Sequence, residues 1–228
     1  MSIYDRDWYK ENQYNKKGSR FVGKGYLLTA LFVLIFSALT YVTSSYISYP
    51  ATISLIVVNV IIFVLIKLKK FNSFEMGMSY PLIMDRKEYY RIVSGAFTHE
   101  EPLHIIFNMY SMYNIGCALE PALGTKLFII IYIVILVGGG LFSFVVHGKF
   151  QQNALCIGAS GTICGLLGVY AVIIFSIYGL TGLRSVISTV IILVLMTASK
   201  KIDSIGHFTG LAVGILCGMV LTKIFLFY

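Results

Sequence analysis

Long, unbroken apolar runs are the feature that most constrains this sequence. Hydrophobic residues make up 57% of the 228 residues and charged residues only 12%, whereas a soluble domain of this length carries about a quarter charged residues. Lipid cannot hydrogen-bond the backbone, so a spanning segment must be a helix or part of a closed barrel. Because the runs are continuous rather than alternating in polarity, we predict an all-α polytopic transmembrane helical bundle.

Seven segments are predicted to span the membrane, each close to the roughly 20 residues that cross about 30 Å of hydrocarbon. The polar tail at 1–24 lacks the short apolar segment and cleavage site of a signal peptide, so we expect the first span to stay in the membrane. The segment 69–98 mixes aromatic and charged residues and is expected to lie half in the interface. The expected spans are 25–47, 51–68, 101–119, 127–146, 156–177, 183–198 and 204–225.

The cysteine spacing and the net charge also bear on possible cofactors and partners. The four cysteines lie in or near apolar spans without forming a CxxC pair, so we predict no disulfide framework, no metal site and no cofactor. The net charge of +8 suits a protein beside anionic lipid, and we expect no nucleic-acid partner. The cysteines are Cys117, Cys156, Cys164 and Cys217.

Four polar side chains at membrane depth are the candidates for function. Such groups are costly in lipid and usually face a protein interior or a water cavity. His104 and Asn108 are spaced i, i+4 and share one helical face. Ser160 and His207 each lie about one turn inside a predicted span, and those two spans enter the membrane from the same side. All four side chains are therefore expected at one depth.

Glycines beside the serine and the histidine predict that their two helices pack closely. The last span carries glycine at every fourth position from Gly206 to Gly218, and the fifth span offers a comparable face from Gly161 to Gly168. Small residues at such spacing let helix backbones approach each other. Close packing would bring the Ser160 hydroxyl within hydrogen-bond reach, about 2.6–3.2 Å, of the His207 imidazole.

This combination predicts nucleophilic catalysis. A serine hydroxyl becomes a good nucleophile when a base removes its proton, and His207 is the candidate base for Ser160. His104, the Asn108 amide and the backbone N–H of Ser160 are candidate donors to an oxyanion. Each group alone has a structural explanation, such as a hydroxyl bonded to a carbonyl one turn earlier or an asparagine joining two helices. Together, at one depth, they favour an active site.

Five motifs make the chain resemble the rhomboid intramembrane serine proteases. The resemblance covers roughly residues 51–225, and the combination of HxxxN, GxSG and GHxxG in this order is highly specific. The motifs are YYR at 89–91, FTHEEPLHIIFN at 97–108, ALEPALG at 118–124, GASG at 158–161 and GHFTG at 206–210.

The resemblance implies a role for each candidate residue. It implies that Ser160 is the nucleophile, that His207 is the general base, and that His104 and Asn108 help to form the oxyanion hole. It implies a structural role for Arg91. The sequence departs from the family in two places. Tyr90 stands where the family usually has tryptophan, and Cys164 stands where an aromatic residue often stacks on the histidine. The resemblance therefore leaves the bracing of His207 open.

The resemblance also implies an architecture and a substrate class. It implies a six-helix catalytic membrane domain at 51–228, preceded by one extra transmembrane helix at 25–50. The implied substrates are transmembrane proteins cut in or near their membrane segment, and the implied location is the cell membrane. The resemblance favours an active site that opens to the outside, whereas the lysines and arginines of 1–24 and 69–98 favour the cytoplasm for that side.

Two other functions remain open at this point. A non-catalytic rhomboid-like protein would bind membrane clients, but such relatives usually lack the serine or the histidine. A small-solute transporter would also place polar groups at mid-depth, but the sequence shows no internal repeat and no paired carboxylates along a path.

Overall fold

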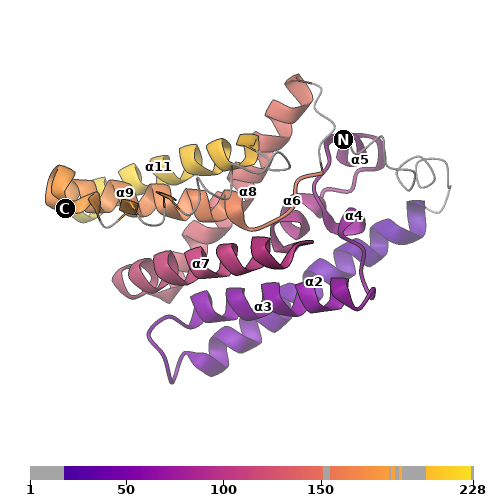
Figure 1. Cartoon of the computed structure of the whole chain (residues 1–228), viewed down its shortest axis with the longest axis horizontal. Coiled ribbons are helices and arrows are strands. Elements are labelled where there is room, and N and C mark those ends of the chain that lie inside the picture. Colours follow the sequence, from indigo (N-terminus) through magenta and orange to yellow (C-terminus); the bar gives the residue numbers. More distant parts are fainter. Residues whose placement is uncertain (1–17, 151–154, 185, 188–189, 192–203, 227–228) are drawn as a thin grey trace.

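The computed structural model describes residues 18–150, 155–184, 186–187, 190–191 and 204–226, and its long elements are all helices (Figure 1). The all-α part of the prediction is therefore confirmed. The helices are α2 (Gly18–Thr43), α3 (Pro50–Lys67), α4 (Ser73–Met76), α5 (Tyr80–Arg86), α6 (Arg91–Ser94), the 3-10 turn η2 (Gly95–Phe97), α7 (Pro102–Leu123), α8 (Thr125–Lys149), α9 (Ser160–Gly182) and α11 (Ser204–Leu226).

Five helices in the described part of the chain are long and apolar enough to cross a membrane. The predicted third span corresponds to α7, whose polar residues keep it out of this group, and most of the predicted span 183–198 lies outside the described residues. The count of seven spans therefore stays a prediction. The five candidate spans are Gly25–Thr43, Pro50–Lys67, Thr125–Lys149, Ser160–Gly182 and Ser204–Phe225.

The helices form a bundle in which α9 and α11 lie side by side, with α8 packed against both (Figure 1). The core is built from the facing sides of α3, α7, α8 and α9, where residues such as Met112, Phe128, Ile163 and Leu166 are completely buried. The opposite sides of these helices expose apolar residues, as expected for surfaces that contact lipid.

Local sequence sets most of the helix boundaries. Pro50 and Pro102 occupy the first positions of α3 and α7, where a missing N–H costs no intrahelical hydrogen bond. Gly124 has φ +76° and separates α7 from α8. The helix α7 continues through Pro121 to Leu123, so the chain leaves the helix only at Gly124.

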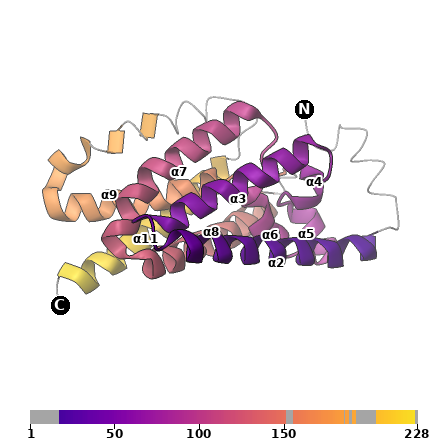
Figure 2. The same ribbon diagram turned by 90° about the horizontal axis from the view of Figure 1, so that it is seen from below.

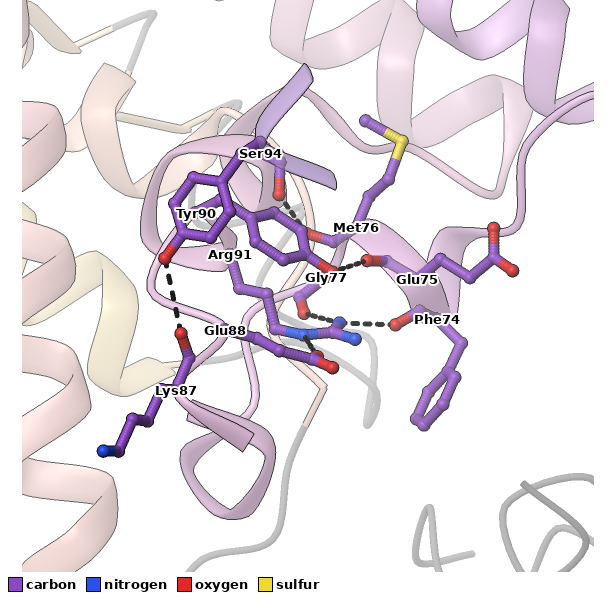
Figure 3. Close-up of polar contacts among 10 residues, drawn as sticks. Phe74, Glu75, Met76, Gly77, Lys87, Glu88, Tyr90, Arg91 and Ser94 are labelled. Atoms are coloured by element: carbon purple, nitrogen blue, oxygen red, sulfur yellow. Dashed lines mark hydrogen bonds and ion pairs between the residues drawn. The ribbon is translucent and has the colours of Figure 1, made fainter. Parts of the chain in front are cut away.

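The segment between α3 and α7 is folded against the bundle as the short helices α4, α5, α6 and η2. Arg91 and Glu88 form a buried ion pair within it. The Arg91 guanidinium also donates to Phe74 O at 2.6 Å and to Gly77 O at 2.8 Å, and Ser94 Oγ donates to Met76 O at 2.6 Å (Figure 3). These bonds give an irregular segment a fixed shape, which matters because it lies against the candidate site.

Candidate active site

Ser160 and His207 lie in hydrogen-bond contact. Ser160 Oγ is 2.7 Å from His207 Nε2, although the two residues are 47 positions apart in the chain. Ser160 is the first residue of α9, and His207 lies in the first turn of α11. Ser160 is buried, and its side chain sits at the helix N-terminus rather than one turn inside the helix as the sequence predicted.

Glycine packing brings these two helices together, as the sequence pattern predicts. A Cβ added at Gly210 of α11 would overlap the carbonyl group of Gly161 in α9, and one at Gly214 would overlap that of Gly165. A third helix joins at the same level, because a Cβ at Gly139 of α8 would lie 3.1 Å from Gly210 Cα. Since these backbones touch, the positions of Ser160 and His207 are fixed by the main chain of three helices.

The candidate oxyanion donors lie beside Gly158, two residues before Ser160. Gly158 has φ +106°, a conformation that other residues rarely adopt. A Cβ at this position would lie 2.7 Å from His104 Nε2 and 3.4 Å from Asn108 Nδ2. The missing side chain therefore leaves the space in which these two polar side chains approach the main chain next to Ser160.

His99 is a buried member of the site that reasoning from the sequence missed. It is completely buried in the bend before α7, with Nε2 2.9 Å from Asn108 Nδ2 and 3.4 Å from the backbone nitrogen of Ala159. Both neighbours donate to Nε2, so this nitrogen carries no proton. His99 thus joins Asn108 to the main chain immediately before Ser160. The sequence did offer a clue to its role, because His99 lies within the FTHEEPLHIIFN motif.

The surroundings of His99 keep its imidazole neutral. Burial, together with the nearby His104 ring, lowers the pKa of His99 to about 3. The two rings are 5.0 Å apart between centroids. A proton on Nε2 would remove the acceptor for both Asn108 and Ala159, so the arrangement requires the neutral form.

The main chain before Ser160 is held by the segment between α3 and α7. Met78 and Cys156 form an isolated antiparallel bridge, with N–H···O bonds of 2.9 Å and 2.8 Å. The Gly158 N–H donates to Gly95 O at 2.9 Å. These three bonds hold residues 156–158 in the extended path that leads into α9.

A cavity of about 70 Å³ lies beside the pair and is lined by Ser160, His207, Gly95, Cys156 and neighbouring residues. One water molecule needs roughly 10–15 Å³ of such space. The cavity therefore has room for water close to the serine hydroxyl, as a hydrolytic reaction requires.

Cys164, at the position of the expected aromatic brace, is buried within α9 and belongs to the hydrophobic core. Among the described residues, no group of three or more His, Cys, Asp or Glu side chains is arranged to hold a metal ion. The reactive groups that lie together here are the Ser160 hydroxyl and the His207 imidazole, with the side chains of His104 and Asn108 beside Gly158.

Comparison with known proteins gives one family. A profile described as "Rhomboid domain" matches residues 86–224, more than half of the chain. "RHOMBOID-like protein 5" of Arabidopsis thaliana is 28% identical over 152 residues, which cover 64% of this chain and 48% of the relative. "Rhomboid-like protease 1" of Toxoplasma gondii is 26% identical over 157 residues, covering 65% and 53%.

A bacterial protein is similar over a shorter stretch. "Rhomboid protease GlpG" of Pectobacterium atrosepticum is 30% identical over 120 residues, which cover 52% of this chain and 41% of the relative. The chain thus spans about half the length of these curated relatives.

Proposed function

The chain belongs to the rhomboid family, and from that membership we propose that this multi-pass membrane protein is an intramembrane serine endopeptidase. It hydrolyses peptide bonds in or near the transmembrane segments of membrane-protein substrates. The observation that carries the proposal is the 2.7 Å contact between Ser160 Oγ and His207 Nε2. The names of two relatives, which call those proteins proteases, agree with it.

The proposed reaction uses Ser160 as nucleophile and His207 as general base. His207 Nε2 takes the hydroxyl proton while Oγ attacks the scissile carbonyl carbon, and the same imidazole then protonates the leaving amine. Water from the cavity then attacks the acyl-enzyme, with His207 again acting as the base, and the second product is released. Ser160 and His207 form the proposed catalytic pair.

Oxyanion stabilisation is assigned to His104, Asn108 and the backbone N–H of Ser160. Ser160 begins α9, and the first N–H groups of a helix have no intrahelical acceptor, so they are free to bind a developing negative charge. The closeness of His104 and Asn108 to Gly158 supports their role. His99 is a positioning residue in this scheme, because it holds the Asn108 amide by a hydrogen bond.

The proposed architecture has three parts. Residues 1–24 form a polar tail, 25–50 an additional N-terminal transmembrane helix, and 51–228 a six-helix catalytic domain in the cell membrane. A substrate helix must unwind before its backbone can reach Ser160, because a helix keeps its peptide groups hydrogen-bonded. Segments rich in small residues and helix breakers are therefore the preferred substrates.

A fluorophosphonate probe tests the proposed nucleophile directly. We expect the full-length protein in detergent or bilayers to be labelled covalently at Ser160. Labelling should disappear in Ser160→Ala and fall by at least about 100-fold in His207→Ala, since the hydroxyl loses its base. The core variant Cys164→Ser, which leaves both reacting groups in place, serves as the comparison. Labelling that persists in Ser160→Ala would show that another residue reacts.

A further inference from the structure

The start of α2 makes a close contact with Tyr90, a residue of the segment between α3 and α7. A Cβ added at Gly25 would lie 2.6 Å from Tyr90 Cε2 and closer still to Cζ. The rings of Tyr26 and Tyr90 pack edge to face with centroids 5.2 Å apart, and Tyr26 OH donates to Lys87 O at 3.3 Å. Figure 2 shows this end of α2 running alongside α5 and α6.

Gly25 is one of the few buried residues of α2 between residues 25 and 43, where the helix otherwise packs against α3 through side chains such as Phe32. Only 11% of its candidate span is buried, and side chains such as Leu27 and Leu34 are exposed. Gly25, in contrast, is buried, and Tyr90 is only 4% exposed. A helix that served only as a membrane anchor would not need a glycine seated on a ring of the neighbouring segment.

Tyr90 fastens the segment that it belongs to. Its hydroxyl donates to Glu75 O at 2.9 Å, and its ring lies against the Arg91 guanidinium, 5.5 Å from centroid to Cζ (Figure 3). Burial raises the pKa of Tyr90 to about 12, so the phenol keeps the proton that makes this bond. The ring therefore links α2 to the carbonyl groups that surround Arg91.

The same segment holds the main chain beside the candidate nucleophile. Met78, two residues after Met76 at the end of α4, pairs with Cys156, and Gly95, directly after α6, accepts the Gly158 N–H. A continuous series of contacts thus runs from Gly25 through Tyr90 to the 156–158 segment. Displacement of the Tyr90 ring would loosen the backbone that sets the oxyanion donors.

We propose that α2 is a positioning element of the active site, acting through the seating of Tyr90 on Gly25. The proposal rests on the proposed protease function for its effect on catalysis, but the mechanical link between α2 and residues 156–158 stands independently. Substrate contacts need not involve α2 itself. Loss of the contact between the Tyr90 ring and Gly25 should therefore lower kcat, because kcat depends on the geometry of the oxyanion donors. It should leave KM nearly unchanged, because the substrate-binding contacts are kept.

The test compares Gly25→Val with Ala30→Val in the full-length protein. Both variants add bulk to α2, but residue 25 faces the Tyr90 ring and residue 30 is exposed. Hydrogen exchange at the Met78, Cys156 and Gly158 amides should become at least about tenfold faster in Gly25→Val and stay unchanged in Ala30→Val. With a cleavable substrate, kcat should fall about tenfold or more in Gly25→Val alone, because small misplacements in an active site are costly.

A double-mutant cycle identifies Tyr90 as the link. Tyr90→Ala alone should speed exchange at the same amides, and Gly25→Val should add nothing on that background, because the ring it displaces is gone. Unchanged exchange in Gly25→Val, or equal effects of Gly25→Val with and without Tyr90, would overturn the inference. A wild type that cleaves nothing while these exchange changes occur would refute the protease function and leave the link intact.

Discussion

At the scale of single residues, Gly158 is the position in the site where a side chain is most clearly excluded. Its φ of +106° and the position of His104, 2.7 Å from where a Cβ would stand, both exclude a side chain. We expect Gly158→Ala to reduce peptide-bond cleavage by about 100-fold or more, as loss of oxyanion donors does. Gly138→Ala is the matched control, since a Cβ there meets Val213 only at 3.4 Å. Equal cleavage by the two variants would contradict this role.

His99 gives a pH dependence of stability. Its pKa is about 3 in the folded protein and about 6.5 in an unfolded chain. The unfolded state therefore binds one more proton between these values, so the stability is complete above about pH 6.5 and falls as the pH decreases towards 3. The loss amounts to about 1.4 kcal/mol per pH unit.

Denaturation curves between pH 4 and pH 8 measure this effect. The side chain of the variant His99→Gln does not titrate. Its free energy of unfolding should therefore depend less steeply on pH in the acid range, and the difference in slope should correspond to about one bound proton. Identical slopes for His99→Gln and the wild type would show that His99 is protonated in the folded protein.

The sequence singles out candidate residues most readily where neighbouring residues form a pattern. The i, i+4 spacing of His104 and Asn108 and the glycines beside Ser160 and His207 made these four residues recognisable. His99 was missed because it lies before the start of α7, so helical spacing does not relate it to Asn108. Its link to Ala159 joins residues 60 positions apart, and no local pattern reports such a contact.

At the scale of helices, Glu120 ties three elements together. Its carboxylate, completely buried near the end of α7, accepts the N–H groups of Ala51 and Thr52 at 2.8 Å and 2.7 Å and the Thr125 hydroxyl at 2.9 Å. Glu120 therefore caps the start of α3, whose first N–H groups have no intrahelical acceptor.

Removing this cap should destabilise the bundle. We expect Glu120→Ala to lower the free energy of unfolding by about 3 kcal/mol or more, because buried donors lose a charged acceptor. Asp85→Ala, which removes an exposed carboxylate from α5, should change it by less than about 0.5 kcal/mol. Thermal unfolding in detergent would compare the two, and equal melting temperatures would contradict the capping role.

Helix boundaries were harder to predict than the helices themselves. The apolar run from residue 156 suggested that Ser160 lies one turn inside a span, but residues 156–158 are extended and pair with Met78 and Gly95. Apolar composition cannot distinguish a buried extended segment from a helix of the same polarity. The difference matters, because only the observed boundary places Ser160 at a helix N-terminus.

At the scale of the whole molecule, the strong apolar bias made the all-α membrane class predictable, because lipid allows few alternatives. The sequence could not predict how the segment 69–98 folds against the site. Its hydrogen bonds depend on carbonyl groups and on single side chains such as Arg91, rather than on a repeating pattern.

Orientation in the membrane is also a property of the whole molecule. Ser160 follows Lys149 at the end of α8 by only 11 residues, too few for another helical crossing, so both lie on the same side of the membrane. We expect a reporter fused after Lys149, in the loop that leads into α9, to face the outside together with Ser160. A reporter found in the cytoplasm would instead agree with the orientation that the basic residues favour, and it would indicate an inward-facing site.

Cleavage of a model transmembrane substrate tests the central claim most directly. The wild type, Ser160→Ala and His207→Ala would be compared in the same bilayer, with folding of each verified by its melting temperature. The 2.7 Å contact predicts that the wild type cleaves the substrate. Both variants should remain folded, and their cleavage rates should be lower by at least about 1,000-fold. Undiminished cleavage by either folded variant would contradict a Ser160–His207 catalytic pair.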